Sequence, residues 1–518
     1  MAFTILGACA ALSIAILIWA WFGMRQPKFH QGKNLPGPVA IPILGSLPHL
    51  VWKLGKNPLQ LSSFQLLLEL RKHFVGEVLG LTLGQNKFII LDELPLIKKV
   101  LCSEDWADRI KDNAMFKERT FGIDYGLLTS NGDSWREMRR FLAKTMVKFG
   151  FGRGSALQTR QEEEISEFFK YFDQKYPGMG NSDGAVVEMQ GLFNVAPLNI
   201  LWTMVTSSRF PYNSEKVVEL TSLLERMTKD IHPKEMGFLA FPWLRYIPGA
   251  TGYTRFMRDA KMLNQYFGEL IKERRELNLY KREQNNFVDA FLAEIDHITS
   301  SSTSPDSNYH YADEQLICVL VDLFVTGFLP IASCLEYLVM FMILHPHVQD
   351  KCRKELDIVL DGSKPTVINN PECMPYISAT IAETLRKVTL IPLTSRAATK
   401  DTWVDKYFVE KGTVALINLY HVHHNDNVWN EPDLFKPERF LDANGKLINQ
   451  ELILPFGTGK RTCPAEVFGR LTIFAFFVSF LQRYEFRSDP ENFGDIDSTP
   501  NAGMGNYPKP FKIFIKIK

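Results

Sequence analysis

The cysteine at position 463 stands in a setting that suits a thiolate. The segment Phe456-Gly457-Thr458-Gly459-Lys460-Arg461-Thr462-Cys463 puts two glycines and two cations directly before the sulfur. Glycine permits positive φ and lets the backbone pass close to a flat ligand, while Lys460 and Arg461 favour the anionic sulfur. Residues 467–481 predict a helix, whose positive N-terminal end adds to the same effect. The alternative is an ordinary buried, apolar cysteine.

Two further segments carry polar side chains at helical spacing. Glu383 and Arg386 are three residues apart, so on a helix they can pair with each other and with a third residue. Trp135 and Arg139 present an indole N–H and a guanidinium, which both donate well to carboxylates. A Glu-x-x-Arg spacing alone is a weak signal, because solvated helix faces produce it often.

In their order along the chain, these segments resemble the cytochrome P-450 family. Residues 456–463 resemble its haem-binding loop, which reads Phe, two spacers, Gly, spacer, Arg, spacer, Cys, spacer, Gly, with Ala465 at the last position here. Pro437-Glu438-Arg439-Phe440 resembles the family segment that supplies the third partner of the Glu-x-x-Arg pair. The resemblance runs from about Leu35 to the C-terminus. It implies the cytochrome P-450 fold, which is mostly α with a small β portion (α+β).

The resemblance also implies a role for each matched residue. Cys463 is expected to be the axial ligand of the iron of haem b, with a thiolate that pushes electron density onto the metal. The expected haem-contacting residues are Trp135, Arg139, Arg396, Phe456 and Arg461, with the indole and the arginines directed at the propionates. For Arg396 a solvent-facing position stays open as the alternative. Glu383, Arg386 and Arg439 are expected to form a buried charge network with a structural role.

The predicted central helix, near residues 313–345, departs from the family pattern. Most members carry an acid followed by threonine where this helix crosses the oxygen site. Here Leu329 stands at the acid position, with Pro330 and Ile331 at the two threonine positions. The sequence therefore contains no acid–alcohol pair at this place, and neither leucine nor isoleucine can guide a proton.

Pro330 predicts a kink in that helix. Proline has no amide hydrogen, so the carbonyl of Thr326, four residues earlier, loses its donor. Our hypothesis is that this carbonyl, the Thr326 hydroxyl and a trapped water replace the missing alcohol. The alternative is that Pro330, with Gly327 nearby, marks an ordinary helix break.

Composition argues for one large enzyme-sized domain and against several other classes. The 518 residues, 46% of them hydrophobic, suffice for a single core. A net charge of +1, without a basic run interleaved with aromatics, gives no reason to expect a nucleic acid partner. Seven scattered cysteines show no disulfide framework and indicate a reducing compartment. His421, His423 and His424 lie close together in a predicted loop, where a metal site is a minor alternative.

The N-terminal region predicts a membrane anchor. Residues 3–22 form a charge-free apolar run of 20 residues, enough to cross about 30 Å of hydrocarbon. Arg25, Lys28 and Lys33 follow and place the rest of the chain in the cytosol. We therefore divide the chain into an anchor (1–24), a Pro-rich, extended, non-helical hinge (25–50) and a haem-binding catalytic domain (51–518). Within the last, residues 77–83 and 87–91 predict two short strands.

The leading functional hypothesis is a haem-thiolate monooxygenase that uses O₂ to oxidise a lipophilic substrate, a sterol or steroid, at the endoplasmic reticulum membrane. The resemblance implies electrons from NADPH through NADPH-cytochrome P-450 reductase, with cytochrome b5 as a further candidate partner. Loss of the acid–threonine pair resembles the insect spook-type enzymes of ecdysteroid synthesis. Two alternatives stay open: a haem-thiolate isomerase or dehydratase that needs no external electrons, and a haem-binding regulator without turnover.

Two sets of residues are candidates for contacts with partner and substrate. A basic set along the Trp135 helix favours an acidic electron donor, and its members are Arg136, Arg139, Arg140, Lys144 and Lys148. The candidate substrate contacts are residues 116–128, residues 192–210 and the face of the central helix around Phe324 and Phe328.

Overall fold

The computed structural model describes residues 13–14, 35–54, 63–84, 86–110, 114–152, 154–180, 184–229, 237, 241–301, 310–360, 370–488, 496–502 and 505–518. Apart from residues 13 and 14, the predicted anchor at residues 3–22 lies outside this part of the chain. The statements below concern the described residues.

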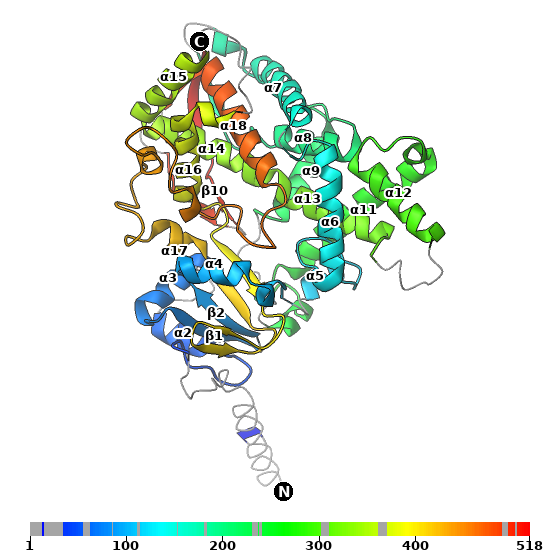
Figure 1. The fold of residues 1–518 in the computed structure, drawn as a ribbon, viewed down its shortest axis with the longest axis vertical. Coiled ribbons are helices and arrows are strands. Elements are labelled where there is room, and N and C mark those ends of the chain that lie inside the picture. Colours follow the sequence, from blue (N-terminus) through cyan, green and yellow to red (C-terminus); the bar gives the residue numbers. More distant parts are fainter. Residues whose placement is uncertain are drawn as a thin grey trace.

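The described chain is mostly helical with a small β portion, which confirms the predicted fold class (Figure 1). Its α-helices are α2 (Leu47–Leu54), α3 (Ser63–His73), α4 (Leu94–Cys102), α5 (Ala114–Arg119), α6 (Gly132–Lys148), α7 (Ser155–Lys175), α8 (Val195–Thr206), α9 (Glu215–Arg226), α11 (Tyr253–Leu277), α12 (Phe287–Ser301), α13 (Asp313–Gly327), α14 (Leu329–Leu344), α15 (Pro346–Leu360), α16 (Pro375–Val388), α17 (Leu419–His424) and α18 (Glu466–Arg483). Its strands are β1 (Val78–Leu83), β2 (Asn86–Leu91), β3 (Ala185–Glu188), β4 (Leu393–Ala397), β5 (Thr402–Val404), β6 (Tyr407–Val409), β7 (Val414–Asn418), β8 (Tyr484–Ser488), β9 (Asn501–Ala502), β10 (Asn506–Tyr507) and β11 (Lys512–Ile517). Short 3₁₀ turns join several of them, among them η2 (Glu104–Trp106) and η9 (Pro437–Phe440).

The main sheet has four strands in the order β1-β2-β7-β4. β1 and β2 confirm the two short strands predicted at residues 77–83 and 87–91, and they pair antiparallel with Val78 opposite Leu91. β7 runs parallel to β2 and antiparallel to β4, where Arg396 pairs with Ala415. In Figure 1 the sheet and the helices α2 to α4 occupy one end of the molecule, and most other helices occupy the opposite end.

The proline-rich segment before α2 packs on the sheet. The Gly80 N–H donates to the Pro36 carbonyl at 2.8 Å, and the Ser46 N–H donates to the Thr82 carbonyl at 2.6 Å. A helix then begins at Leu47 and includes Pro48, so our prediction of a non-helical segment up to residue 50 is wrong at its end. Proline is tolerated there because the first turn of a helix needs no amide donor.

The helical part is built around the predicted central helix, which consists of two helices. α13 and α14 meet at Phe328, and α14 packs against α16 and α18. Within the described residues, Asp313–Leu344 is the one helical stretch long and apolar enough to span a membrane. Because most of this stretch is buried inside the protein, it is a core element.

Candidate functional site

The cysteine loop, residues 456–463, depends on its two glycines. Gly457 and Gly459 have φ angles of 72° and 75°, as expected from the sequence. A Cβ atom on Gly459 would lie 2.0 Å from the carbonyl oxygen of Leu101 at the end of α4, so only glycine allows this approach. The Cys463 N–H donates to the Phe456 carbonyl at 2.9 Å and closes the loop just before α18.

Cys463 is partly exposed between this loop and α18. Burial raises the pKa of its thiol, whereas the Ala465 N–H and the Arg139 guanidinium lower it and Glu466 raises it. The net direction is upward, so a cation bound to the sulfur would be required to keep it as a thiolate at neutral pH. Arg139 reaches this place from α6, where its Nη2 donates to the Thr462 carbonyl at 2.7 Å.

Our expectation that Lys460 and Arg461 favour the anionic sulfur is wrong. Lys460 is turned to the surface and pairs with Glu104 of η2. Arg461 is turned inward, where its Nη2 donates to the Ser130 carbonyl at 2.7 Å and its guanidinium lies 3.8 Å from the ring centre of Trp135. Successive side chains of a loop point in different directions, so neighbours of Cys463 in sequence need not be neighbours of its sulfur.

Arg109, Arg396 and Arg461 form a group beside the cysteine loop, which we call the arginine cluster. Arg396 and Arg461 are buried, and Arg109 is half-buried. Nη2 of Arg396 donates to the Arg461 carbonyl at 3.3 Å, and Nη1 of Arg109 donates to the Ser395 carbonyl at 2.6 Å. Burial, and then the charges of Arg109 and Arg461, lower the pKa of Arg396 to about 8. Burial also lowers the pKa of Arg109 to about 10 and that of Arg461 to about 9. Arg396 is 3% exposed, so the solvent-facing alternative is wrong.

The arginine cluster has an excess of buried positive charge. The Nε atoms of Arg109 and Arg396 have no hydrogen-bond partner, and no carboxylate of the described chain acts on either guanidinium. Burying an unpaired cation is costly, so this place favours an anionic ligand. The two carboxylates at one edge of haem b fit it. Sequence reasoning missed Arg109, because Ser395 and Arg396 lie far along the chain and no local spacing marks it.

Glu383, Arg386 and Arg439 come together as a buried network. Arg386 Nε lies 2.7 Å from one Glu383 oxygen, and Arg439 Nε lies 3.1 Å from the other. The side chains of Glu383 and Arg386 are fully buried, and Arg386 also donates to the carbonyls of His423 and Pro432 at 2.7 and 2.9 Å. The network joins α16 to η9 and to the segment after α17, which is a structural arrangement.

The histidines at positions 421, 423 and 424 lie on α17 and not in a loop. Nδ1 of His423 lies 3.0 Å from the Thr389 hydroxyl, and its Nε2 accepts from the Leu454 N–H at 3.1 Å. Both ring nitrogens of His424 contact backbone carbonyls. Burial lowers the pKa of His423 to about 3 and that of His424 to about 4. The described residues contain no group of three or more metal-ligating side chains, so the alternative of a histidine metal site is not supported.

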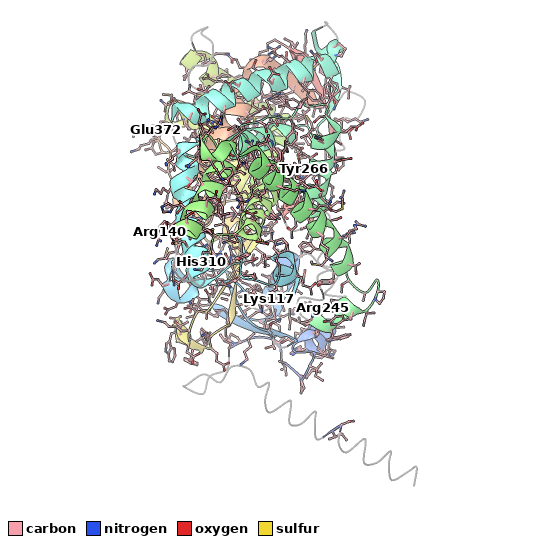
Figure 2. The ribbon with its side chains drawn as sticks, turned by 90° about the vertical axis from the view of Figure 1, so that its right-hand side faces the viewer. Lys117, Arg140, Arg245, Tyr266, His310 and Glu372 are labelled. Carbon is pink, nitrogen blue, oxygen red and sulfur yellow. The ribbon has the colours of Figure 1, made fainter. Side chains whose placement is uncertain are left out.

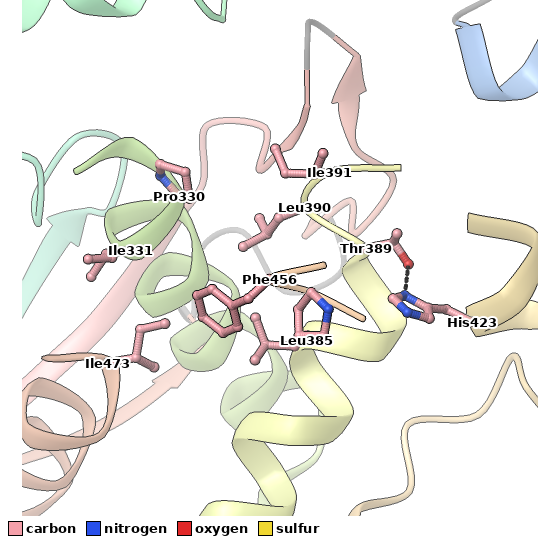
Figure 3. A pocket seen from close by; sticks show the side chains of 10 residues that line it. Pro330, Ile331, Leu385, Thr389, Leu390, Ile391, His423, Phe456 and Ile473 are labelled. Carbon is pink, nitrogen blue, oxygen red and sulfur yellow. Dashed lines mark hydrogen bonds between the residues drawn. The ribbon is translucent and has the colours of Figure 1, made fainter. Parts of the chain in front are cut away.

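The break in the central helix faces the cysteine loop. α13 ends at Gly327 and α14 begins at Leu329, with Pro330 in its first turn. Leu329 is 2% exposed and points into the core. Pro330 and Ile331 line a cavity of about 50 Å³ together with Phe456 (Figure 3). The rest of its lining is mostly apolar and consists of Leu385, Leu390, Ile391, Pro455 and Ile473, with Thr389 and His423 as the polar members. The structure therefore brings the predicted oxygen-site helix and the cysteine loop to one place.

The proposed substrate face around Phe324 and Phe328 is core. Both side chains are fully buried, and the Phe324 ring stacks on Phe267 with centroids 5.4 Å apart and lies 5.1 Å from Trp202. The contacts come from Phe267 of α11 and Trp202 of α8. Aromatic side chains at helical spacing served packing here, which is their commoner use.

The basic residues of α6 are only partly available for a partner. Arg136 and Arg140 form ion pairs with Asp133 and Glu137 of the same helix, and Arg139 points toward the cysteine loop. Arg140 lies at the edge of the molecule in Figure 2. Lys144 and Lys148 are exposed near the C-terminal end of the helix.

Comparison with known proteins places this chain in a family. The family model described as Cytochrome P450 matches residues 35–515. Farnesoate epoxidase of Bombyx mori is 29% identical over 510 residues, which cover 98% of each chain. Cytochrome P450 2D4 of Rattus norvegicus is 31% identical over 95% of this chain and 94% of its own, and Cytochrome P450 2J1 of Oryctolagus cuniculus is 31% identical over 96% and 93%. The chain therefore belongs to the cytochrome P-450 family of monooxygenases, which bind haem b.

Proposed function

We propose that this protein oxidises a lipophilic substrate, a sterol or steroid, at the endoplasmic reticulum membrane, with electrons from NADPH delivered by NADPH-cytochrome P-450 reductase. The observation that carries the proposal is the position of the cysteine loop opposite the apolar break in the central helix. Cys463 would ligate the iron, Phe456 would pack on the ring, and the arginine cluster with Trp135 and Arg139 would hold its carboxylate edge. When bound, haem supplies the activation of O₂.

The test of this function is product formation. Membranes that contain the protein and the reductase are incubated with NADPH and a panel of sterols, steroids, isoprenoid acids and fatty acids, and products are identified by mass. We expect one oxygen atom to be added to a sterol or steroid. An isoprenoid acid is the second candidate, because the relative from Bombyx mori is named Farnesoate epoxidase and matches over nearly the whole chain.

An isomerase or dehydratase remains the alternative reaction. Its support is the apolar character of Leu329, Pro330 and Ile331, since a rearrangement without external electrons needs no proton delivery at this place. Turnover of a lipid hydroperoxide without NADPH would favour it. NADPH oxidation that depends on both reductase and substrate would exclude it.

The surface of α6 supports a proposed docking site for the electron donor. Lys144 and Lys148 are exposed. Arg136 and Arg140 also lie on this helix, but each is partly neutralised by an ion pair with a carboxylate of α6. An acidic partner such as the reductase, or cytochrome b5, would be attracted to this face. We expect Lys144→Glu with Lys148→Glu to slow NADPH-dependent reduction of the haem and to weaken its salt dependence. Reduction by dithionite serves as the control.

We also propose the domain organisation drawn from the sequence: an uncleaved anchor at residues 1–24, a proline-rich connection at residues 25–50 and a cytosolic catalytic domain at residues 51–518. Its support is the apolar, charge-free run at residues 3–22 followed by Arg25. N-terminal sequencing of the membrane-bound protein and protease protection test it. A mature chain that begins near Gly23 would identify the run as a secretory signal instead.

A further inference from the structure

The central helices carry three hydroxyl-bearing residues, and only one is accessible. Ser333 and Tyr337 of α14 are 3% and 1% exposed and lie in the core. Thr326, in the last turn of α13, is exposed. Any hydroxyl that α13 or α14 offers to a ligand is therefore that of Thr326.

Thr326 lies in the last turn of α13, next to the helix break that faces the cysteine loop. Four residues before it, the Asp322 carboxylate accepts from the N–H groups of Leu127 and Leu128 at 2.6 and 2.8 Å. Four residues after it, Pro330 lines the cavity with Phe456 (Figure 3). Residues four apart share one face of a helix, so Thr326 shares a face of α13 with Asp322. Pro330 lies beyond the break at Phe328, and along the chain Thr326 stands four residues before this place of the missing alcohol.

The helix break leaves acceptors open around this hydroxyl. Pro330 cannot donate to the Thr326 carbonyl. The Ile331 N–H, which would reach Gly327 in an unbroken helix, donates to Phe328 at 3.1 Å. The Thr326 hydroxyl itself donates to the Asp322 carbonyl at 2.7 Å, so its oxygen is left as an acceptor. A group of neighbouring acceptors suits a water molecule. The water can donate one hydrogen to an acceptor at the helix break and the other to a reacting group.

We propose that Thr326 takes the place of the missing alcohol: its hydroxyl oxygen and the open carbonyls at the helix break hold an ordered water that delivers protons to the oxygen site. Thr326 is thus a positioning residue for the monooxygenase reaction. The inference rests on that reaction, but the geometry of the water site does not depend on which lipid is oxidised.

The test compares Thr326→Val, which keeps the shape and removes the hydroxyl, with Thr326→Ser, which keeps the hydroxyl. Ser333→Ala, on a buried hydroxyl of α14, is the matched control. Product formed per NADPH oxidised should fall about tenfold or more in the valine variant, with hydrogen peroxide in place of product, and should be nearly normal in the other two. Pro330→Ala restores an N–H donor for the Thr326 carbonyl, so this variant should also form less product per NADPH oxidised.

A second readout needs no turnover. Bound CO whose oxygen accepts a hydrogen bond has a lower C–O stretching frequency, so the infrared spectrum of the reduced CO complex reports a donor at the oxygen site. Thr326→Val should raise this frequency, and Thr326→Ser should not. Unchanged coupling in the valine variant, or lower coupling without an infrared shift, would overturn the proposal. If the wild type formed no product from any lipid, the proposed function would fail while the infrared comparison still decided the role of Thr326.

Discussion

The two regions that face each other across the candidate site are built in opposite ways. On one side, the cysteine loop and the arginine cluster combine a thiol, two buried cations and one half-buried cation, and a loop held by backbone hydrogen bonds. On the other, α13 and α14 present an apolar surface with a single exposed hydroxyl, at Thr326.

The contrast separates two demands of the reaction. Binding an anionic, iron-containing cofactor requires fixed charges in fixed places, and we propose that the first region supplies them. Moving protons requires only a chain of donors and acceptors, which side chains, backbone or water can provide. The second region can therefore depart from the family pattern without loss of the cofactor.

Removal of the sulfur should have the largest effect. Cys463→Ala is expected to abolish the absorption of the reduced CO complex at about 450 nm and all turnover, because the side chains of the arginine cluster cannot ligate iron in place of the sulfur. Difference spectra of membranes measure the loss. Cys102→Ala, at an exposed cysteine, is the control. A normal spectrum in the Cys463 variant would contradict the assignment of the cysteine loop as the thiolate side.

Disruption of the charge network of Glu383, Arg386 and Arg439 should have the second-largest effect. Glu383→Ala leaves the buried Arg386 and Arg439 without their carboxylate, which costs about 3 to 5 kcal/mol of folding free energy. We expect little folded, haem-loaded protein, measured by expression level and urea unfolding. Glu431→Ala, at an exposed carboxylate that pairs with Lys436, is the control. A folded Glu383 variant that lost only turnover would point to a catalytic role instead.

Removal of one cation from the arginine cluster should change two properties in opposite directions. Arg109→Leu relieves an unpaired buried charge in the haem-free protein and deprives the bound haem of a partner. We expect higher unfolding stability of the haem-free form and haem loss that is about tenfold to a hundredfold faster. Transfer of haem to apomyoglobin measures the rate, with Lys460→Leu as the surface control. Equal rates would mean that the cluster serves folding and not the cofactor.

Features of the cysteine loop and of the charge network were predictable where they depend on residues close together in the sequence. The i,i+3 pair at Glu383, the glycines before Cys463 and the helix after it could be read from spacing, and the structure places them accordingly. The place of Arg109 in the arginine cluster could not be predicted, because its neighbours come from β4 and the cysteine loop, which are distant in the sequence. The outward turn of Lys460 could not be read either, because side-chain direction in a loop depends on the backbone angles of its glycines.

In the central helix, the sequence predicted a disturbance at Pro330 and left two forms open, a kink and an ordinary helix break. Proline lacks an amide hydrogen, so one helical hydrogen bond must be lost. In the structure the helix is interrupted at Phe328, between α13 and α14. The burial of Leu329 and of Phe324 depends on which face of each helix meets the core. Helices apolar all round carry no such information in their sequence pattern.

Restoring the family pattern on the helix side should reduce function moderately. Leu329→Glu with Pro330→Thr straightens the helix and removes the open Thr326 carbonyl, and the new glutamate is buried among apolar groups. We expect product per NADPH oxidised to fall about threefold or more. Pro330→Thr alone separates the effect of the helix from that of the buried acid. A clear rise in the double variant would show that the site is a damaged relay and not an adapted one.

The smallest effect concerns the one acid buried in the apolar α14. Glu336 accepts from the Gly191 N–H at 2.7 Å, and burial raises its pKa to about 8. Between about pH 4.3, where an unfolded glutamate titrates, and the native value, the native state keeps a proton that the unfolded state releases, so stability falls as the pH rises. Glu336→Gln should remove this contribution, which we expect to be about 1.4 kcal/mol per pH unit at most. Urea unfolding at several pH values measures it, with Glu372→Gln at an exposed position as the control. If both variants kept the wild-type dependence of unfolding free energy on pH, Glu336 would be ionised in the native protein. α14 would then carry a fixed buried charge.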